Sequence, residues 1–201
     1  MKRIGWSAGL AVIVSAGPAH AHSSFPGIEG FYVGFLHPFS TPAQALVILG
    51  LGFLAGGFDA ARTRWHLGAF LAAILIGMFL GNGSDQDVSL FAVAFLACAW
   101  AALAPGRILS FTVGLVAIGG LLIGIVSVPD PGPLRDRVIT MAGSLVGANI
   151  GFLYVFGIML LIRERFALEW VRIALRIAAA WTGAISLVML ALHFAPSEAG
   201  L

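Results

Sequence analysis

Six long apolar segments, separated by short connections that carry most of the charges, limit the folds that this chain can adopt. We place them near residues 41–58, 65–81, 89–104, 108–128, 138–162 and 170–193. Their lengths approach the ~20 residues with which an α-helix crosses a bilayer. With 60% hydrophobic and 10% charged residues, the chain has too little polar surface for a water-facing globule. The sequence predicts an all-α polytopic membrane protein, a six-helix bundle whose main partner is the lipid bilayer. The net charge of +2 is too small to indicate a nucleic-acid surface.

The first 21 residues have the pattern of a cleavable signal peptide. Two cations precede an apolar run over residues 4–16, and Ala19-His20-Ala21 forms a small-x-small cleavage site. Cleavage would leave residues 22–201 as a single membrane domain. His22 would then carry a free amine and an imidazole, and both groups bind metal ions. The alternative is that His22 is the first residue of a solvated tail.

The connections between the apolar segments differ in charge. One set carries six arginines: Arg62, Arg64, Arg107, Arg163, Arg165 and Arg172. The other set comprises residues 82–88, which hold two aspartates, and residues 129–137, in which acids and arginines balance. By the positive-inside rule, the arginine-rich set faces the cytoplasm. We therefore expect a multi-pass protein of a bacterial-type inner membrane, with both termini of the mature chain in the periplasm.

Two prolines interrupt the start of the first segment. Residues 30–36 are too short to cross a membrane, and Pro38 and Pro42 each remove a backbone donor and disfavour helix at the preceding residue. We expect an interfacial or re-entrant turn here, and then a helix that starts near Thr41 with Pro42 at its first position. Non-helical backbone at membrane depth needs protein or water as hydrogen-bond partners for its N–H and C=O groups. This segment is therefore a candidate for the lining of a site.

His37 is the leading candidate for a metal ligand, because it lies in this broken segment at the end expected to face the exported side of the membrane. Neutral imidazole suits nickel, cobalt, copper and zinc. A metal site needs several ligands, and His22, Glu29 and the aspartates of residues 82–88 lie on the same predicted side. The alternative is a lone histidine that caps a turn.

Glycines recur at four-residue spacing in several segments. The sets are Gly52/Gly56, Gly77/Gly81, Gly120/Gly124 and Gly143/Gly147/Gly151. Lipid gives helices little hydrophobic reason to associate, so close backbone contact through small residues is expected to hold them together. We favour packing within one chain over a dimer interface. The triplet identifies residues 138–162 as the expected centre of the bundle.

Polar residues are scarce inside the predicted spans. Gln44, Asn149 and Tyr154 are candidates for a substrate path, and hydrogen bonding between helices is the alternative for the last two. The sequence shows no paired carboxylates, nucleophile elbow, phosphate-binding loop or His-Glu-x-x-His motif. Its single cysteine, Cys98, excludes an intrachain disulfide. We therefore expect neither an enzyme nor a bound cofactor.

Together these features resemble the HupE/UreJ family, membrane proteins linked to hydrogenase and urease maturation and regarded as nickel or cobalt permeases. The resemblance rests on Ala-His at the cleavage site, on Gly-Phe-x-x-Gly-Phe-x-His-Pro at residues 30–38, and on a Gly-rich helix at 46–55. A weaker similarity covers residues 141–160. The family pattern His-Pro-x-x-Gly-x-Asp-His has Gly, Asp and His where this chain has Thr41, Ala43 and Gln44.

The resemblance implies an inner-membrane protein that handles a divalent transition metal, Ni²⁺ or Co²⁺. His37 would then be the periplasmic entry ligand, assisted by His22, and Gln44, Asn149 and Tyr154 would line the path. The alternative is a non-transporting accessory subunit that keeps the fold and binds another membrane protein or a metalloenzyme-maturation partner.

Overall fold

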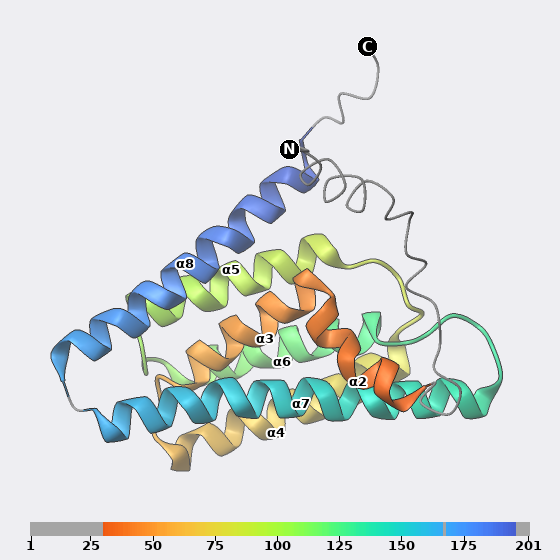
Figure 1. Ribbon diagram of the computed structural model, residues 1–201, viewed down its shortest axis with the longest axis horizontal. Coiled ribbons are helices and arrows are strands. Elements are labelled where there is room, and N and C mark those ends of the chain that lie inside the picture. Colours follow the sequence, from red (N-terminus) through yellow and green to blue (C-terminus); the bar gives the residue numbers. More distant parts are fainter. Residues whose placement is uncertain (1–29, 167, 196–201) are drawn as a thin grey trace, which may run out of the picture.

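The computed structural model describes residues 30–166 and 168–195, and these residues form seven α-helices and no strand. The predicted signal peptide and His22 lie outside the described residues. The helices are α2 (Phe31–Ser40), α3 (Pro42–Ala55), α4 (Ala60–Leu80), α5 (Asp87–Leu103), α6 (Leu109–Val126), α7 (Leu134–Arg165) and α8 (Glu169–His193) (Figure 1). The all-α prediction is confirmed for this part of the chain.

Four helices, α4, α6, α7 and α8, are each long and apolar enough to cross a membrane. The pair α2 and α3 meets the same test as one broken span, with a bend of 74° between its two helices. Helix α5 is apolar but has only 17 residues, about 26 Å at a rise of ~1.5 Å per residue, slightly less than a ~30 Å hydrocarbon core. The chain is therefore a multi-pass membrane protein, and the count of six spans stays a prediction.

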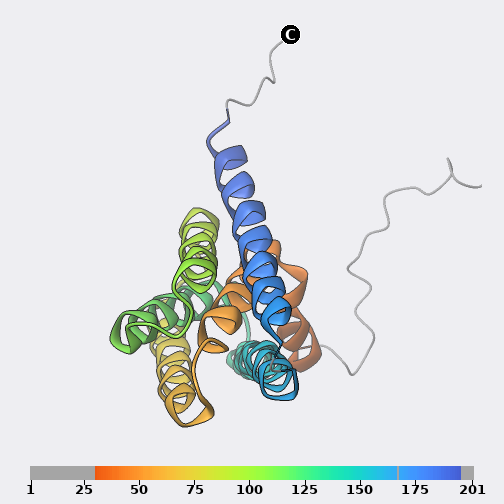
Figure 2. The ribbon, with the colours of Figure 1, turned by 90° about the vertical axis from the view of Figure 1, so that its left-hand side faces the viewer.

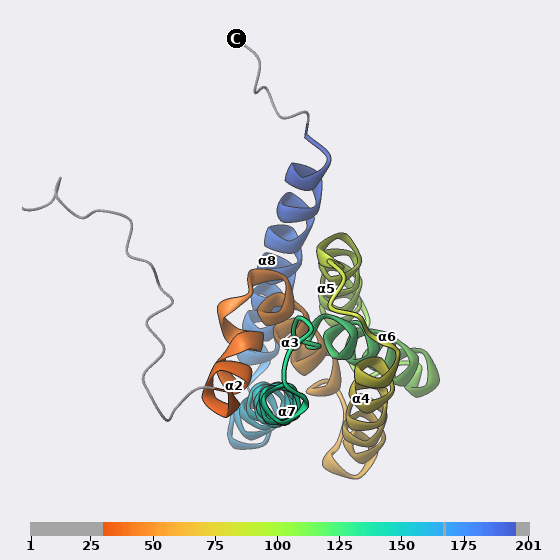
Figure 3. The same ribbon diagram turned by 90° about the vertical axis from the view of Figure 1, so that its right-hand side faces the viewer.

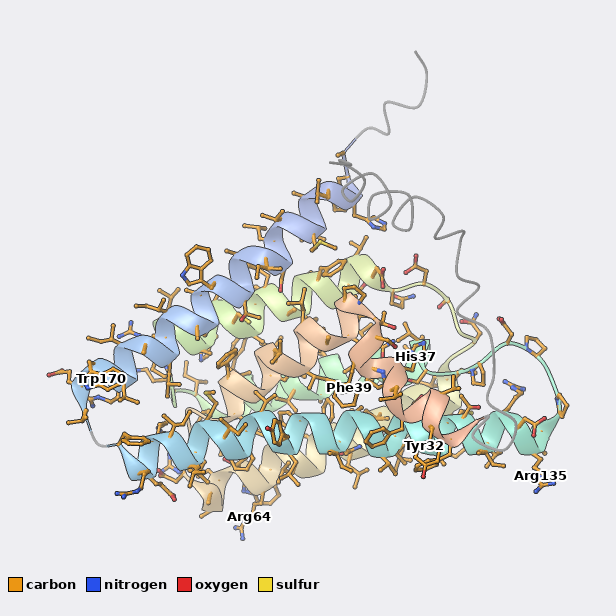
Figure 4. All side chains as sticks on the ribbon, in the orientation of Figure 1. Tyr32, His37, Phe39, Arg64, Arg135 and Trp170 are labelled. Carbon is orange, nitrogen blue, oxygen red and sulfur yellow. The ribbon has the colours of Figure 1, made fainter. Side chains whose placement is uncertain are left out.

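Charged residues gather at opposite ends of the bundle. Seven arginines and three acids lie at or near the end where α3, α5 and α7 finish and α4, α6 and α8 begin. Four aspartates and two arginines lie around the connections at the other end. Figure 4 shows Arg64 and Trp170 at the first end, here called the arginine end, and Arg135 at the opposite end.

Helix α3 forms the centre of the bundle, which corrects the expectation that residues 138–162 would do so. Nine of the 14 residues of α3 are buried, whereas α7 buries seven of 32. Figure 3 shows α3 between α2, α5, α6 and α7. The glycine triplet of α7 was misleading because it packs against only one side, towards α2 and the start of α3. Helix α8 is the least buried of the long helices and leans away from the others (Figure 2).

Glycines allow the helix backbones to approach closely, as the sequence predicts. A Cβ on Gly77 of α4 would lie 2.9 Å from the Cα of Gly124 in α6, and the converse holds for Gly124. A Cβ on Gly52 of α3 would lie 2.6 Å from Cβ of Val155 in α7. These contacts join helices of one chain. Cys98 is fully buried in α5, and its Sγ and Cβ lie against Gly50 of α3 and Gly183 of α8, respectively, which fits a structural thiol.

Before the break, where non-helical backbone was expected, Phe31–Ser40 is a continuous helix with Pro38 inside it. Pro38 has no N–H to donate to the carbonyl group of Gly34, four residues earlier. Ser144 of α7 supplies the missing donor, since its hydroxyl donates to the Gly34 carbonyl oxygen at 3.1 Å. A hydrogen bond from another helix thus allows α2 to continue past its proline.

The break falls instead at Thr41, which has extended backbone angles of φ −96° and ψ 113°. Extended backbone is the usual conformation before a proline. Helix α3 then begins with Pro42 at its first position, as predicted. The prediction of a broken segment is therefore confirmed, with two helices meeting at an angle where a turn was expected.

Candidate functional site at the α2–α3 bend

His37 and Gln44 face each other across the bend. Nδ1 of His37, one turn before the end of α2, lies 3.1 Å from Nε2 of Gln44, in the first turn of α3. The imidazole is half-buried, and Gln44 is 1% exposed. Figure 4 shows His37 towards the end of the bundle that lies opposite Arg64. The bend therefore brings together two polar side chains that are seven residues apart in the sequence.

Close packing of α2 on α7 holds the bend in place. A Cβ on Gly143 would lie 2.9 Å from the carbonyl carbon of Phe31, and one on Gly147 would lie 3.0 Å from that of Phe35. The rings of Phe31, Phe35 and Phe39 follow one another along α2, with centroids 6.4 and 6.0 Å apart. With these contacts α2 has a defined register on α7, and this register determines the position of His37.

Hydrogen bonds also satisfy the carbonyl groups that the end of α2 leaves free. The hydroxyl of Ser40 donates to the carbonyl oxygens of Leu36 and His37 at 3.1 and 3.2 Å. The N–H of Thr41 donates to the same His37 oxygen at 3.1 Å. The backbone at the bend is thus paired internally, and the His37 side chain remains available for another role.

The chemistry of the pair depends on how the Gln44 amide is turned. When its NH₂ group donates to Nδ1, the neutral ring carries its proton on Nε2. When the amide oxygen accepts from Nδ1–H, the lone pair of Nε2 is free to bind a metal ion, which is how second-shell groups orient histidine ligands. Oε1 of Gln44 is buried and has no hydrogen-bond partner among the described residues. The site therefore has an unpaired oxygen beside the imidazole.

The family model described as HupE / UreJ protein matches residues 10–93. Over these residues the chain is similar to the HupE/UreJ family. The match includes α2, α3 and α4, and with them the whole bend around His37. It confirms the resemblance seen in the sequence. Comparison with the curated proteins and with the solved structures gave no significant match.

The HupE/UreJ pattern has its second histidine at the position of Gln44. In this structure that position is the one whose side chain touches His37 across the bend. The position of the pattern's aspartate is occupied by Ala43, which is buried with 1% exposure in the core. The fold thus brings the first and last positions of the family pattern into contact, although this chain has an amide where the pattern has an imidazole.

Other residues predicted for the site lie elsewhere. Asn149 is half-buried on α7 and donates from its amide to the Leu145 carbonyl oxygen of the same helix at 2.8 Å. Tyr154 is 68% exposed on the outer surface of α7. His22 and Glu29 lie outside the described residues. Within the described part of the chain no group of three His, Cys, Asp or Glu side chains is placed to hold a metal ion.

His66 is a buried polar residue that the sequence analysis did not single out. It lies in α4 with 0% exposure, and its Nε2 is 3.0 Å from Oγ1 of Thr112 in α6. The ring packs on Phe58 with centroids 4.9 Å apart, and Nδ1 has no partner among the described residues. Its spacing from Thr63 and Phe70 is the signal that would have found it, since all three share the buried face of α4.

Proposed function

We propose that this protein is a divergent HupE/UreJ-type inner-membrane protein that handles Ni²⁺ or Co²⁺, with His37 as the ligand that receives the ion. The family is associated in general with nickel or cobalt accessory or transport functions. The orientation proposed from the positive-inside rule puts the α2–α3 bend near the periplasmic side and both termini in the periplasm. The metal ion is the cargo in this proposal, and no enzymatic activity is part of it.

The observation that carries the proposal is the contact between His37 and Gln44. Two segments of the family pattern meet there, with 3.1 Å between the imidazole and the amide. An imidazole nitrogen is a good ligand for Ni²⁺ and Co²⁺, and an amide oxygen can orient the ring from behind. His37 is only half-buried, so an ion can reach it without opening the bundle.

The remaining ligands are also part of the proposal. After signal cleavage, His22 would offer its amine and imidazole, and Asn149 would line the inner part of the path. A path that offers the His37 imidazole and amide groups binds a divalent ion more weakly than one that offers a carboxylate and two imidazoles. We therefore expect weak binding and release, as a permease requires.

Uptake of labelled nickel or cobalt into vesicles tests this function. Wild-type protein, His37→Ala and the matched control His193→Ala are reconstituted at equal density, since His193 is an exposed histidine at the end of α8. Uptake by the wild type and the control, with at least a tenfold lower rate for His37→Ala, supports the proposal. Equal uptake by all three, or none by any, refutes it.

A second candidate function is that of a non-transporting accessory subunit. The observation in its favour is the presence of Ala43 and Gln44 where the family pattern has Asp and His, because the fold is kept while two ligands are replaced. Purification in mild detergent would then recover a stoichiometric partner, such as a membrane or metalloenzyme-maturation protein. Isolation of a solitary protein that binds Ni²⁺ would count against this candidate.

A further inference from the structure

A cavity with three guanidinium groups opens at the arginine end of the bundle. It has a volume of about 230 Å³ and lies between α3, α5, α7 and α8. Its lining combines apolar side chains, among them Phe53, Met159 and Leu175, with the cations Arg163, Arg172 and Arg176. This cavity is distant from His37 along the bundle, so it is separate from the site at the α2–α3 bend (Figure 4).

Two of the three arginines are held in place by helix ends. Arg163 of α7 donates from Nη1 to the carbonyl oxygens of Gly56 and Phe58, just beyond α3. Arg176 of α8 donates from Nε to the carbonyl oxygen of Ala102, in the last turn of α5, at 2.6 Å. These bonds satisfy carbonyl groups that helix ends leave free. Each uses one nitrogen of a group with five N–H donors, so both cations are fixed while most of their donors remain for a ligand.

The third arginine, Arg172, is held only by an exposed ion pair within the described residues. Arg172 pairs with Glu169 at 3.3 Å, but the two side chains are 70% and 82% exposed, and exposed pairs of this kind contribute little. The whole arginine end carries seven arginines and three acids, so the field there favours an anion. The hydrogen bonds of Arg163 and Arg176 are to neutral carbonyl groups, so they leave the positive charge beside the cavity in place.

An apolar groove beside the cavity distinguishes between kinds of anion. It has a volume of about 250 Å³ and is formed by Ala102 of α5 together with Ile173, Ile177 and Ala180 of α8. Arg176 borders both the groove and the cavity. A free phosphate ion would leave the groove unused, whereas a phospholipid has a charged headgroup joined to an acyl chain. Basic pockets between membrane helices with adjoining apolar surface suit anionic lipids.

We propose that this cavity binds the headgroup phosphate of an anionic phospholipid, with Arg172 and Arg176 on the phosphate and an acyl chain in the groove between α5 and α8. The lipid then fills the cavity beside the first half of α8, which is the least buried of the long helices. Its role is to tie the exposed α8 to α5 and α7, and it does not depend on metal binding at His37.

Thermal unfolding of the purified full chain in a neutral detergent tests the proposal. The probes are phosphatidylglycerol, phosphatidylcholine and inorganic phosphate, each titrated separately. We expect a saturable rise in unfolding temperature with phosphatidylglycerol and a much smaller one with the other two. An equal rise with phosphatidylcholine overturns the proposal. An equal rise with inorganic phosphate at the same concentration also overturns it, because the site would then be one for a soluble anion.

Variants separate the cavity from the general surface charge. Arg172→Gln removes the cation that caps no helix, and we expect it to weaken phosphatidylglycerol binding about fivefold, the effect of one cation near a membrane surface. Arg165→Gln is the matched control, because Arg165 is an exposed cation at the same end that does not line the cavity. Ala180→Phe fills the groove without touching a charge and is expected to weaken lipid binding as well. Equal weakening by Arg165→Gln and Arg172→Gln, or no effect of Ala180→Phe, overturns the proposal.

Discussion

Gly34→Ala is the substitution that most directly tests how α2 is held. A Cβ at this position would overlap the carbonyl oxygen of Thr140 in α7 and lie 2.8 Å from its carbonyl carbon. Ordinary contact begins at 3.4 Å, so α2 must move by at least about 0.6 Å, and further to clear the oxygen. The same movement lengthens the hydrogen bond from Ser144 to the Gly34 carbonyl oxygen. The change is therefore expected to disturb both the packing and the bend.

The expected loss follows from these two effects. Overpacking at a tight contact costs about 1–3 kcal/mol, and a hydrogen bond between membrane helices contributes about 0.6–1.7 kcal/mol. Alanine regains about 0.5–1 kcal/mol through its helix propensity. We predict that the free energy of unfolding of Gly34→Ala falls by about 1–4 kcal/mol, and that Ni²⁺ binding weakens because His37 lies in the next turn of α2.

Unfolding in mixed micelles of mild detergent and dodecyl sulfate measures this loss. Gly157→Ala is the control, because a Cβ on Gly157 of α7 meets nothing within 4 Å and should leave stability unchanged or slightly raised. The same stability for the two variants would refute the proposed packing of α2 on α7.

Three further substitutions test single contacts. Ser144→Ala removes the hydroxyl that bonds the α2 carbonyl oxygen, so we expect a loss of about 0.6–1.7 kcal/mol in the same unfolding assay, and an unchanged midpoint would contradict this. Thr112→Val leaves both ring nitrogens of buried His66 without a partner and should cost about 1–2 kcal/mol; the double variant with His66→Phe should recover part of it. Gln44→His places a second imidazole against His37 and should raise Ni²⁺ affinity at least tenfold in equilibrium dialysis, whereas a lower affinity would argue against a shared site.

The helical architecture was predictable because each segment needs only its own residues to satisfy its backbone. A membrane helix pairs its N–H and C=O groups internally, so a long apolar run is sufficient evidence for it. Glycines such as Gly77 and Gly124 likewise indicate close packing through their four-residue spacing within apolar segments. The break before Pro42 was predictable for the same local reason, because the proline restricts the residue before it.

Properties that depend on distant partners were not predictable. Pro38 lies within a helix, and Ser144, on another helix, donates to the Gly34 carbonyl oxygen that the proline leaves without its usual partner. The central position of α3 was hidden because helices that are apolar on all sides give no sign of which face is buried. His66 lies near the start of the apolar segment predicted at 65–81, and its burial depends on the approach of α6. The contact of His37 with Gln44 required the bend angle, which no local pattern specifies.

Direct binding of Ni²⁺ or Co²⁺ to the purified protein is the measurement that most directly tests His37 as the metal ligand. Equilibrium dialysis compares the wild type with His37→Ala and with His193→Ala, which removes a histidine far along the chain from the bend. We predict saturable binding to the wild type and to His193→Ala, and binding at least tenfold weaker to His37→Ala. Equal binding by all three proteins would contradict the assignment of His37 as the ligand that receives the ion.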